Sequence, residues 1–307
     1  MKRTSRCEET VLLRTYLLRE YGLSTNALKR LKFREDGISV NGKRVTVRYL
    51  LQPGDLVELD TDDRRDTDVK TEGEFSSVAP VELPLHVVYE DACITVCDKP
   101  GDMPTHPSHG HLCDTAANAL AFRALKRGDS AYVFRPVNRL DRNTSGLFLC
   151  ANDFLSSGKL GRQLREGRIR KTYLCILCGV PACPEGTVDA PIVRADVGTM
   201  MRVVRGDGAP AVTDYRVAAV SPDGKYSLCV VRPRTGRTHQ IRVHMAHLGC
   251  PLLGDEIYGD VSPLLCRHAL HACRLEFDHP ADGRRMVFTS AMPQDMADAC
   301  RTLFLKT

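Results

Sequence analysis

Apolar and polar positions follow two different periods in the first sixty residues. In residues 10–22 apolar side chains return every four positions, which predicts an amphipathic helix. Residues 26–36 predict a second helix, which Ser24 or Thr25 can cap and which Gly37 ends. The chain therefore opens with two short helices.

A small sheet is expected to follow these helices. Residues 38–47 predict a hairpin around an Asn-Gly turn, and residues 51–60 predict a further strand after a Pro-Gly turn. We therefore expect residues 1–62 to form a small α/β module. The polar residues 63–80 are interpreted as a linker to the rest of the chain.

From residue 81 onward, short apolar runs typical of strands dominate the pattern. Helical spacing is confined to residues 116–126, behind a cap at Asp114 or Thr115, and to residues 153–165 and 238–249. Because there is no regular β-α-β alternation, we predict an α+β domain with a mainly antiparallel mixed sheet and flanking helices over the remaining residues to 307. Two strands are expected within residues 84–100, and others at residues 147–151, 169–180, 186–193, 201–204, 211–220, 225–233, 268–277 and 284–290.

Basic residues concentrate in two stretches, although the formal net charge is only +5. Residues 159–171 carry six basic residues and one acid, and residues 1–60 carry twelve basic and eight acidic residues. A basic surface suits a polyanionic partner such as nucleic acid. The alternative is a set of solvated helix faces.

The thirteen cysteines are interpreted as reduced, buried side chains. The first residues are polar and show no secretory signal, and no apolar stretch is long enough to span a bilayer. Cys175 and Cys178 point to opposite faces of a predicted strand, whereas Cys93 and Cys97 share a face but lie about 13 Å apart. We therefore expect a cytoplasmic protein that uses no zinc or other metal and contacts no membrane.

Residues 234–249 contain guanidinium, hydroxyl and imidazole groups close together. The turn at 234–238 opens a helix, whose free N–H groups favour an anion. His244 and His247 share a helix face, which suggests a metal site, but no glutamate stands where an H-E-x-x-H protease needs one. Arg242 lies between His239 and the other two imidazoles and would repel a cation, so we interpret the three histidines as core or supporting residues.

Asp141 stands at the entrance to a tight turn, just behind Arg139. If Arg242 is buried it needs an acid partner, because an unpaired buried charge costs several kcal/mol, and Asp141 is the natural candidate. A guanidinium within about 4–6 Å keeps a carboxylate ionised, so that it acts as a nucleophile or base. A glycosidase would need a second carboxylate about 5–10 Å away, and none is equally marked. The alternative is that Asp141 only caps the turn and pairs with Arg139.

Four separated stretches carry a resemblance to a known family. NRLDRNTSGLFLCA, residues 138–151, resembles the HRLD-x-x-TSG-L signature of the RluA-type pseudouridine synthases. Residues 94–108, 171–179 and 234–259 resemble their N-K-P-x-G opening motif, their K-x-Y strand and their later block, in the family's order. The resemblance covers residues 81–300. The N-terminal sixty residues resemble the alpha-L RNA-binding module of small-subunit ribosomal proteins.

The resemblance implies a function and a set of roles. These enzymes detach the uracil of a uridine in structured RNA, rotate it and rejoin it through carbon 5, without a cofactor. Asp141 would be the catalytic aspartate, Arg242 its salt-bridge partner and Tyr173 the ring that stacks on the flipped base, while Arg139 would fill the space that the base leaves in the RNA. We expect ribosomal RNA as the substrate and a monomeric enzyme. The remaining expected RNA contacts are Ile241, Arg237, Thr238 and His239 at the pocket, and Lys29, Arg30, Lys43 and Arg44 on the N-terminal module.

Two positions depart from the family pattern. Asn138 stands where the family usually has histidine, and Cys250 replaces a common histidine. Neither change removes the acid, its partner or the stacking ring, so we expect activity. The alternatives are a non-catalytic RNA-binding or ribosome-assembly factor that keeps the fold, and a nucleoside or glycoside hydrolase.

Overall fold

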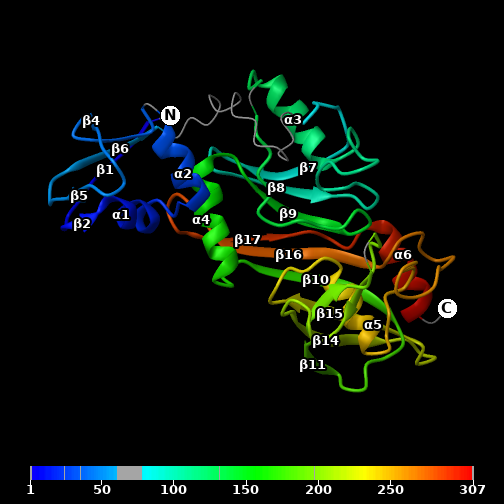
Figure 1. Ribbon diagram of the computed structural model, residues 1–307. Helices are drawn as coiled ribbons and strands as arrows, with labels where there is room; N and C mark the ends of the chain where they lie inside the picture. Colours follow the sequence, from blue (N-terminus) through cyan, green and yellow to red (C-terminus); the bar gives the residue numbers. More distant parts are fainter. Residues whose placement is uncertain are drawn as a thin grey trace.

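The computed structural model describes residues 2–305, apart from residues 24, 35, 61–77, 131 and 197. It shows a small N-terminal unit beside a larger one that is built on a nine-stranded sheet (Figure 1). The predicted linker lies mostly outside the described residues, and residues 78–80 form neither helix nor strand. Within the described ranges, no helix has the length and apolar character needed to cross a membrane.

The N-terminal unit packs two helices on a four-stranded antiparallel sheet of order β1-β6-β3-β4. Asn41 and Gly42 both have positive φ, at 52° and 76°, as a two-residue hairpin turn requires, so the predicted hairpin is confirmed. Strand β1 was not predicted, because KRTSR has no apolar residue; its backbone pairs with β6. The elements are β1 (Lys2–Arg6), β2 (Val11–Leu12), α1 (Leu13–Glu20), α2 (Thr25–Phe33), β3 (Ile38–Val40), β4 (Lys43–Arg44), β5 (Leu50–Leu51) and β6 (Leu56–Asp60).

The large sheet has the order β11-β14-β15-β10-β16-β9-β8-β7, and β17 pairs with β16 beside this path. Its pairings are antiparallel except for β9 with β16, so the predicted mainly antiparallel mixed sheet is confirmed. The strands are β7 (His86–Glu90), β8 (Ile94–Lys99), β9 (Ser145–Ala151), β10 (Arg170–Cys178), β11 (Glu185–Asp189), β14 (Val212–Val220), β15 (Tyr226–Pro233), β16 (Leu270–Asp278) and β17 (Arg285–Thr289), with a separate hairpin of β12 (Ile192–Arg194) and β13 (Arg202–Val204).

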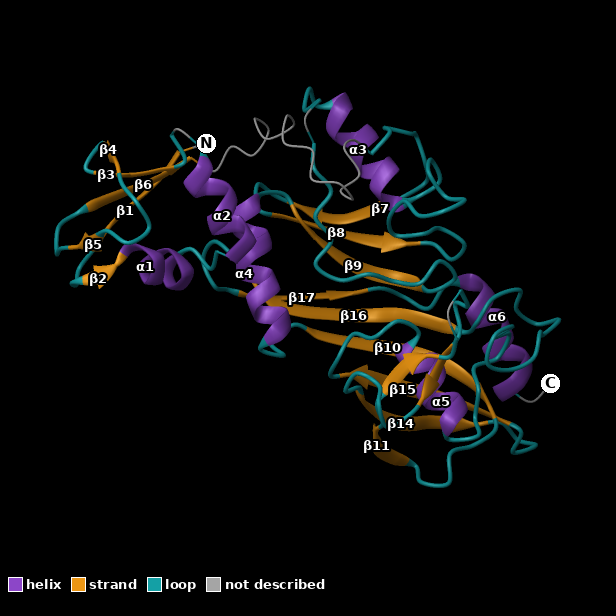
Figure 2. Ribbon diagram, viewed as in Figure 1, coloured by secondary structure: helices purple, strands orange, loops and turns teal. Residues whose placement is uncertain are grey.

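Helices pack beside the large sheet and against some of its inner strands (Figure 2). Helix α3 (Ala116–Lys126) begins at a capping box between Thr115 and Asn118, and α4 (Phe154–Arg165) begins at Asp153, whose carboxylate accepts two backbone N–H groups. Both starts agree with the sequence prediction. Helix α5 (Gln240–His247) is shorter than expected, and α6 (Gln294–Phe304) was missed, because the last residues were assigned to strands alone.

Helix α4 packs between the N-terminal unit and the large sheet. Leu155 of α4 belongs to the apolar core of the N-terminal unit, together with Leu17 and Leu28. Gly158 lies so close to the N-terminal unit that a Cβ atom there would stand 2.6 Å from the carbonyl oxygen of Gly22. The basic helix is therefore packed against the N-terminal unit on one side and β9 on the other.

Candidate active site

Hydrogen bonds from buried residues hold the loop that carries Asp141. The Thr105 hydroxyl donates to the Leu140 carbonyl oxygen at 2.8 Å and accepts the Leu140 N–H at 3.1 Å. The Thr144 N–H donates to the Asp141 carbonyl oxygen at 3.0 Å and closes the turn. The backbone on both sides of Asp141 is thus fixed by hydrogen bonds.

Two buried cations hold the next part of the same loop. The Lys99 ammonium donates to the carbonyl oxygens of Arg142 and Pro100, at 2.9 and 2.7 Å. Burial lowers the pKa of Lys99 to about 7. The Arg267 guanidinium donates to the Asn143 carbonyl oxygen at 3.0 Å. These contacts keep the loop in one conformation, which a reacting carboxylate needs.

Gly146, the second residue of β9 after this loop, has a conformation that favours glycine. Its φ is +107°, and an added Cβ atom would lie 2.7 Å from the backbone nitrogen of Ala272. This close approach occurs where β9 and β16 pair in parallel. The glycine therefore lets the start of β9 lie directly beside β16, just after the Asp141 loop.

The Asp141 carboxylate stands at the boundary between the protein interior and solvent. Its side chain is 31% exposed, whereas that of Arg242 is 5% exposed, and the two approach to 3.8 Å between Oδ2 and Nη1. The acid can therefore be reached from outside, while the guanidinium beside it is shielded. Sequence reasoning paired these two residues, and the structure does bring them together.

The main partner of Arg242 is nevertheless Asp255, which the sequence analysis did not single out. Arg242 donates Nε–H and Nη2–H to the two Asp255 oxygens, both at 2.7 Å, and Asp255 has no exposed surface. Burial alone would lower the pKa of Arg242, but the hydrogen bonds and charge of Asp255, with that of Asp141, raise it. An acid inside the apolar run Pro-Leu-Leu-Gly-Asp was the available signal.

Tyr258 and His239 extend this network. The Arg242 guanidinium carbon lies 5.1 Å from the centre of the Tyr258 ring. The Tyr258 hydroxyl accepts the Arg202 N–H and lies 2.9 Å from His239 Nδ1. Burial lowers the pKa of His239, although the charge of Asp141 opposes this. His239 also has a φ of 57°, which is strained for a residue other than glycine and typical of functional sites.

Apolar side chains line the inner wall of the site. Tyr173, Ile241 and Leu140 are all buried and belong to one core cluster. Burial raises the pKa of Tyr173, and the charge of Asp141 raises it further, so the phenol is neutral. A flat neutral ring close to a carboxylate is a suitable surface for an extruded base.

The other residues predicted to contact RNA lie at or outside the rim. Arg139 is exposed, and its Nη1 lies 3.3 Å from His106 Nε2. Arg237 is exposed and donates Nε–H to the Pro210 carbonyl oxygen, while Thr238 is half-buried. The structure places Lys29, Arg30, Lys43 and Arg44 on α2 and β4 of the N-terminal unit, all exposed and separate from the Asp141 pocket.

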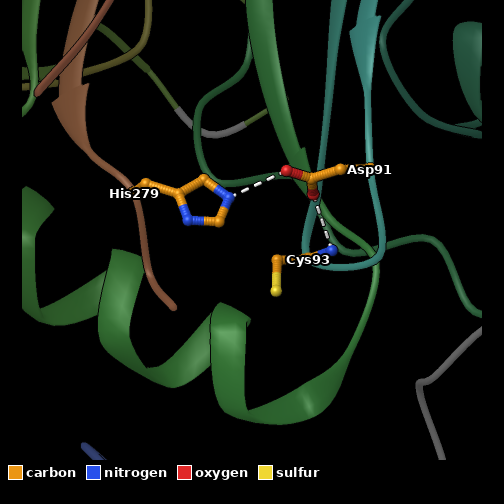
Figure 3. A group of neighbouring side chains, drawn as sticks. All are labelled: Asp91, Cys93 and His279. Atoms are coloured by element: carbon orange, nitrogen blue, oxygen red, sulfur yellow. Dashed lines mark hydrogen bonds and ion pairs between the residues drawn. The ribbon is translucent and has the colours of Figure 1, made fainter. Parts of the chain in front are cut away.

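A second polar cluster lies at the turn between β7 and β8 (Figure 3). Asp91 accepts the N–H groups of Cys93 and Ile94 on Oδ1, and it binds Tyr89 Oη and His279 Nε2 through Oδ2. The Cys93 sulfur points toward α4. Although these residues approach closely enough for a metal, the four hydrogen bonds occupy the lone pairs of the carboxylate. The cluster is accounted for as a hydrogen-bonded turn.

The prediction of buried cysteines is only partly right, because Cys113, Cys183 and Cys266 are exposed. Cys93, Cys97 and Cys175 are buried free thiols, and Cys178 is half-buried and also free. Burial raises the pKa of Cys93, Cys97 and Cys175, so they remain protonated.

Comparison with known proteins shows the family to which the chain belongs. Residues 94–247 match the family described as RNA pseudouridylate synthase. The chain is 39% identical over 231 residues to ribosomal large subunit pseudouridine synthase D of Zymomonas mobilis, covering 71% of this chain and 72% of the relative. The chain belongs to the RluA-type family of RNA pseudouridine synthases.

Two further members extend this RNA pseudouridine synthase relationship. The uncharacterized RNA pseudouridine synthase YhcT of Bacillus subtilis is 36% identical over 267 residues, which cover 87% of this chain and 85% of the relative. The solved structure of human RNA pseudouridylate synthase domain containing 4 covers 70% of this chain and 92% of its own, with a TM-score of 0.57 at 26% identity. The predicted fold class and enzyme class are thus confirmed.

Asn138 and Cys250, the two departures from the RluA-type pattern, are both buried. Asn138 Oδ1 accepts the Leu149 N–H at 2.9 Å, so this residue still ties the loop to β9. Its Nδ2 is buried and has no hydrogen-bond partner among the residues that the structure describes. Cys250 is buried, and a Cβ atom on Gly179 would lie 3.2 Å from its sulfur. Asn138 therefore still anchors the loop that carries Asp141, and Cys250 is part of the apolar core.

Proposed function

We propose that this synthase converts specific uridines of ribosomal RNA to pseudouridine and that Asp141 is its catalytic carboxylate. The observation that carries the proposal is the half-exposed Asp141 side chain, 3.8 Å from a buried arginine that Asp255 holds in place. Ribosomal RNA is proposed because relatives of this chain are named for the large ribosomal subunit.

The reaction requires one bond exchange and one proton exchange. The bond between C1′ of the ribose and N1 of the uracil breaks, and a bond between C1′ and C5 forms. Carbon 5 loses a proton and N1 gains one, so no redox partner or group donor is needed. Asp141 acts either on the sugar carbon or as the base for a sugar proton.

The residues around Asp141 would hold the flipped uridine and the RNA that surrounds it. Extrusion of the uridine costs a few kcal/mol, and stacking on the neutral ring of Tyr173 offsets about 1–3 kcal/mol of that cost. Arg139 is exposed at the rim, where it can occupy the vacated stack. Ile241 forms the apolar wall, and Arg237, Thr238 and His239 lie on the turn that precedes α5.

The N-terminal unit is proposed to bind the RNA outside the pocket as an alpha-L type module. Lys29 and Arg30 on α2 and Lys43 and Arg44 on β4 are exposed cations. Such residues grip phosphates in a salt-dependent manner. We propose a monomeric enzyme that acts in the cytoplasm, where ribosomal RNA is assembled.

A hydrolase is disfavoured by the state of the second carboxylate. An acid catalyst for glycoside cleavage must hold a proton and reach the substrate. Asp255 has no exposed surface, and its hydrogen bonds with Arg242 are bidentate. The charge and hydrogen bonds of Arg242 outweigh the effect of burial and lower the pKa of Asp255, so it is an ionised structural partner.

Mapping of pseudouridine in cellular RNA tests the proposed function. Maps are compared between cells with the gene, cells without it, and cells that carry Asp141→Asn. We expect at least one ribosomal site to disappear in both altered strains. Unchanged maps would favour a non-catalytic RNA-binding or assembly factor. Loss of a site only without the gene, but not with Asp141→Asn, would remove Asp141 from the mechanism.

A further inference from the structure

Two lysines on strands β8 and β10 are removed from solvent in different ways. Lys99 is buried and donates hydrogen bonds to two carbonyl oxygens of its surroundings. Lys171 is half-buried on β10, two residues before Tyr173. Among the described residues, the Lys171 ammonium forms neither a hydrogen bond nor an ion pair. A cation that is partly removed from water without a partner is unfavourable for folding and needs a reason.

Lys171 lies near Tyr173 and near the turn that precedes α5. Side chains two residues apart on a strand share a face, so Lys171 and Tyr173 point to the same side of β10, about 7 Å apart along it. The Lys171 ammonium also approaches the turn before α5, since a Cβ atom on Gly236 would lie 3.9 Å from Nζ. Lys171 therefore lies between the ring proposed to stack on the base and the turn at residues 234–238.

The charges nearby leave Lys171 available. Arg234 of the turn is already paired with Asp214, and Arg274 of β16 is paired with Glu276. Burial lowers the pKa of Lys171, and no neighbouring carboxylate opposes this effect. An anion that reaches this position would meet a partly buried ammonium that has no partner among the described residues.

We propose that Lys171 binds a backbone phosphate of the RNA next to the flipped uridine, between β10 and the turn at residues 234–238. The inference rests on the proposed function, because it takes Tyr173 as the stacking ring. A nucleotide whose base lies on Tyr173 has its phosphate within reach of a lysine side chain that starts about 7 Å away on the same face. The unpaired ammonium is thus a phosphate site whose cost to stability is recovered only in the complex with RNA.

The proposal predicts effects of opposite sign on stability and binding. In Lys171→Met the apolar stem remains while the charge is removed, so we expect the Tm to rise. Binding of transcribed large-subunit ribosomal RNA should weaken roughly tenfold, as for loss of a charge-assisted hydrogen bond. The slope of log Kd against log salt should fall by about one, because one phosphate contact is lost. Lys171→Arg should retain most of the affinity and the slope.

Lys225→Met is the matched control. Lys225 is exposed in the turn between β14 and β15, and the register of β10 with β15 places that turn at the far end of the sheet from Lys171. We expect no change in Tm, affinity or slope for this variant. A Lys171→Met protein with an unchanged slope, or with lowered Tm and unchanged affinity, would overturn the proposal and leave Lys171 a structural residue.

The binding assay is independent of the isomerisation assay. If the wild-type protein forms no pseudouridine but Lys171→Met still lowers the salt slope of RNA binding by about one, the proposed function fails and the phosphate contact stands. If it forms pseudouridine while Lys171→Met keeps the full salt slope, the phosphate contact fails and the proposed function stands. A wild-type chain that binds none of the transcript would overturn both.

Discussion

The two sides of the Arg242 guanidinium differ in burial, distance and chemistry. On the inner side Asp255 is fully buried and makes two hydrogen bonds of 2.7 Å. On the outer side Asp141 is 31% exposed and lies 3.8 Å away. A carboxylate that satisfies a buried cation cannot also react, because its lone pairs are occupied. Because Asp255 already pairs with Arg242, Asp141 is not needed for that pairing. Each of the following substitutions alters one side of the guanidinium.

The largest effect is expected from Asp141→Asn on the outer side. Activity should fall by about 10⁴-fold or more, the order seen when a catalytic group is removed. The free energy of unfolding should change by less than about 0.5 kcal/mol, because the side chain is partly exposed and Arg242 keeps Asp255. Single-turnover pseudouridine formation and urea denaturation measure the two quantities. A large loss of stability would mean that the two acids share one structural role.

On the inner side, Asp255→Asn should destabilise the fold by about 3–5 kcal/mol, since it leaves Arg242 as a buried charge without its main partner. Activity should fall as well, because the guanidinium beside Asp141 is no longer held. Urea denaturation of this variant beside Asp141→Asn gives the comparison directly. Equal stability of the two variants would contradict the division of roles.

The loop on the outer side should depend on Thr105. Thr105→Val keeps the shape of the side chain but leaves the Leu140 N–H and carbonyl oxygen without this partner. An unsatisfied buried polar group costs about 1–3 kcal/mol, so both stability and the rate of pseudouridine formation should fall. Thr105→Ser, which retains the hydroxyl, is the control. If Thr105→Val reacts as fast as wild type, Asp141 does not need this support.

The smallest expected effect is the pH dependence of stability that arises from His268, which lies near the charges of Arg242 and Asp255. Burial, with the charge of Arg242, lowers the pKa of His268 to about 3. A histidine that stays neutral in the folded state contributes stability above its unfolded pKa of about 6.5, and this stability is lost as the pH falls toward the folded pKa. Between pH 7 and pH 5 the loss from His268 should be about 2 kcal/mol.

His268→Gln isolates the contribution of His268 to the pH dependence of stability. This variant is needed because burial also lowers the pKa of His239, His244 and His271. Unfolding measured at pH 7 and pH 5 should show a smaller difference for the variant than for wild type. An identical difference in both proteins would place the pH dependence elsewhere.

Local features of the fold were predictable from neighbouring residues alone. The helix starts near Thr115 and Asp153 and the Asn41-Gly42 turn depend on side chains within three positions. The sequence therefore indicated them correctly, although it left Asp114 open as an alternative to the Thr115 cap. Asp141, Arg242 and Tyr173 were also marked in advance, because their motifs follow one another in the family's order. Their catalytic roles stay a prediction.

Only the tertiary structure decided which groups meet. Strand β1 has no apolar pattern and exists because its backbone pairs with β6, and Asp255 became the main partner of Arg242 because the chain folds back thirteen residues later. The sequence by itself indicated most of the helices and strands, the basic stretches and the position of Asp141 in a family motif, since these depend on residue type and spacing. Long-range pairing and burial determined which carboxylate is held and which stays free, because hydrogen bonds and desolvation depend on neighbours in space.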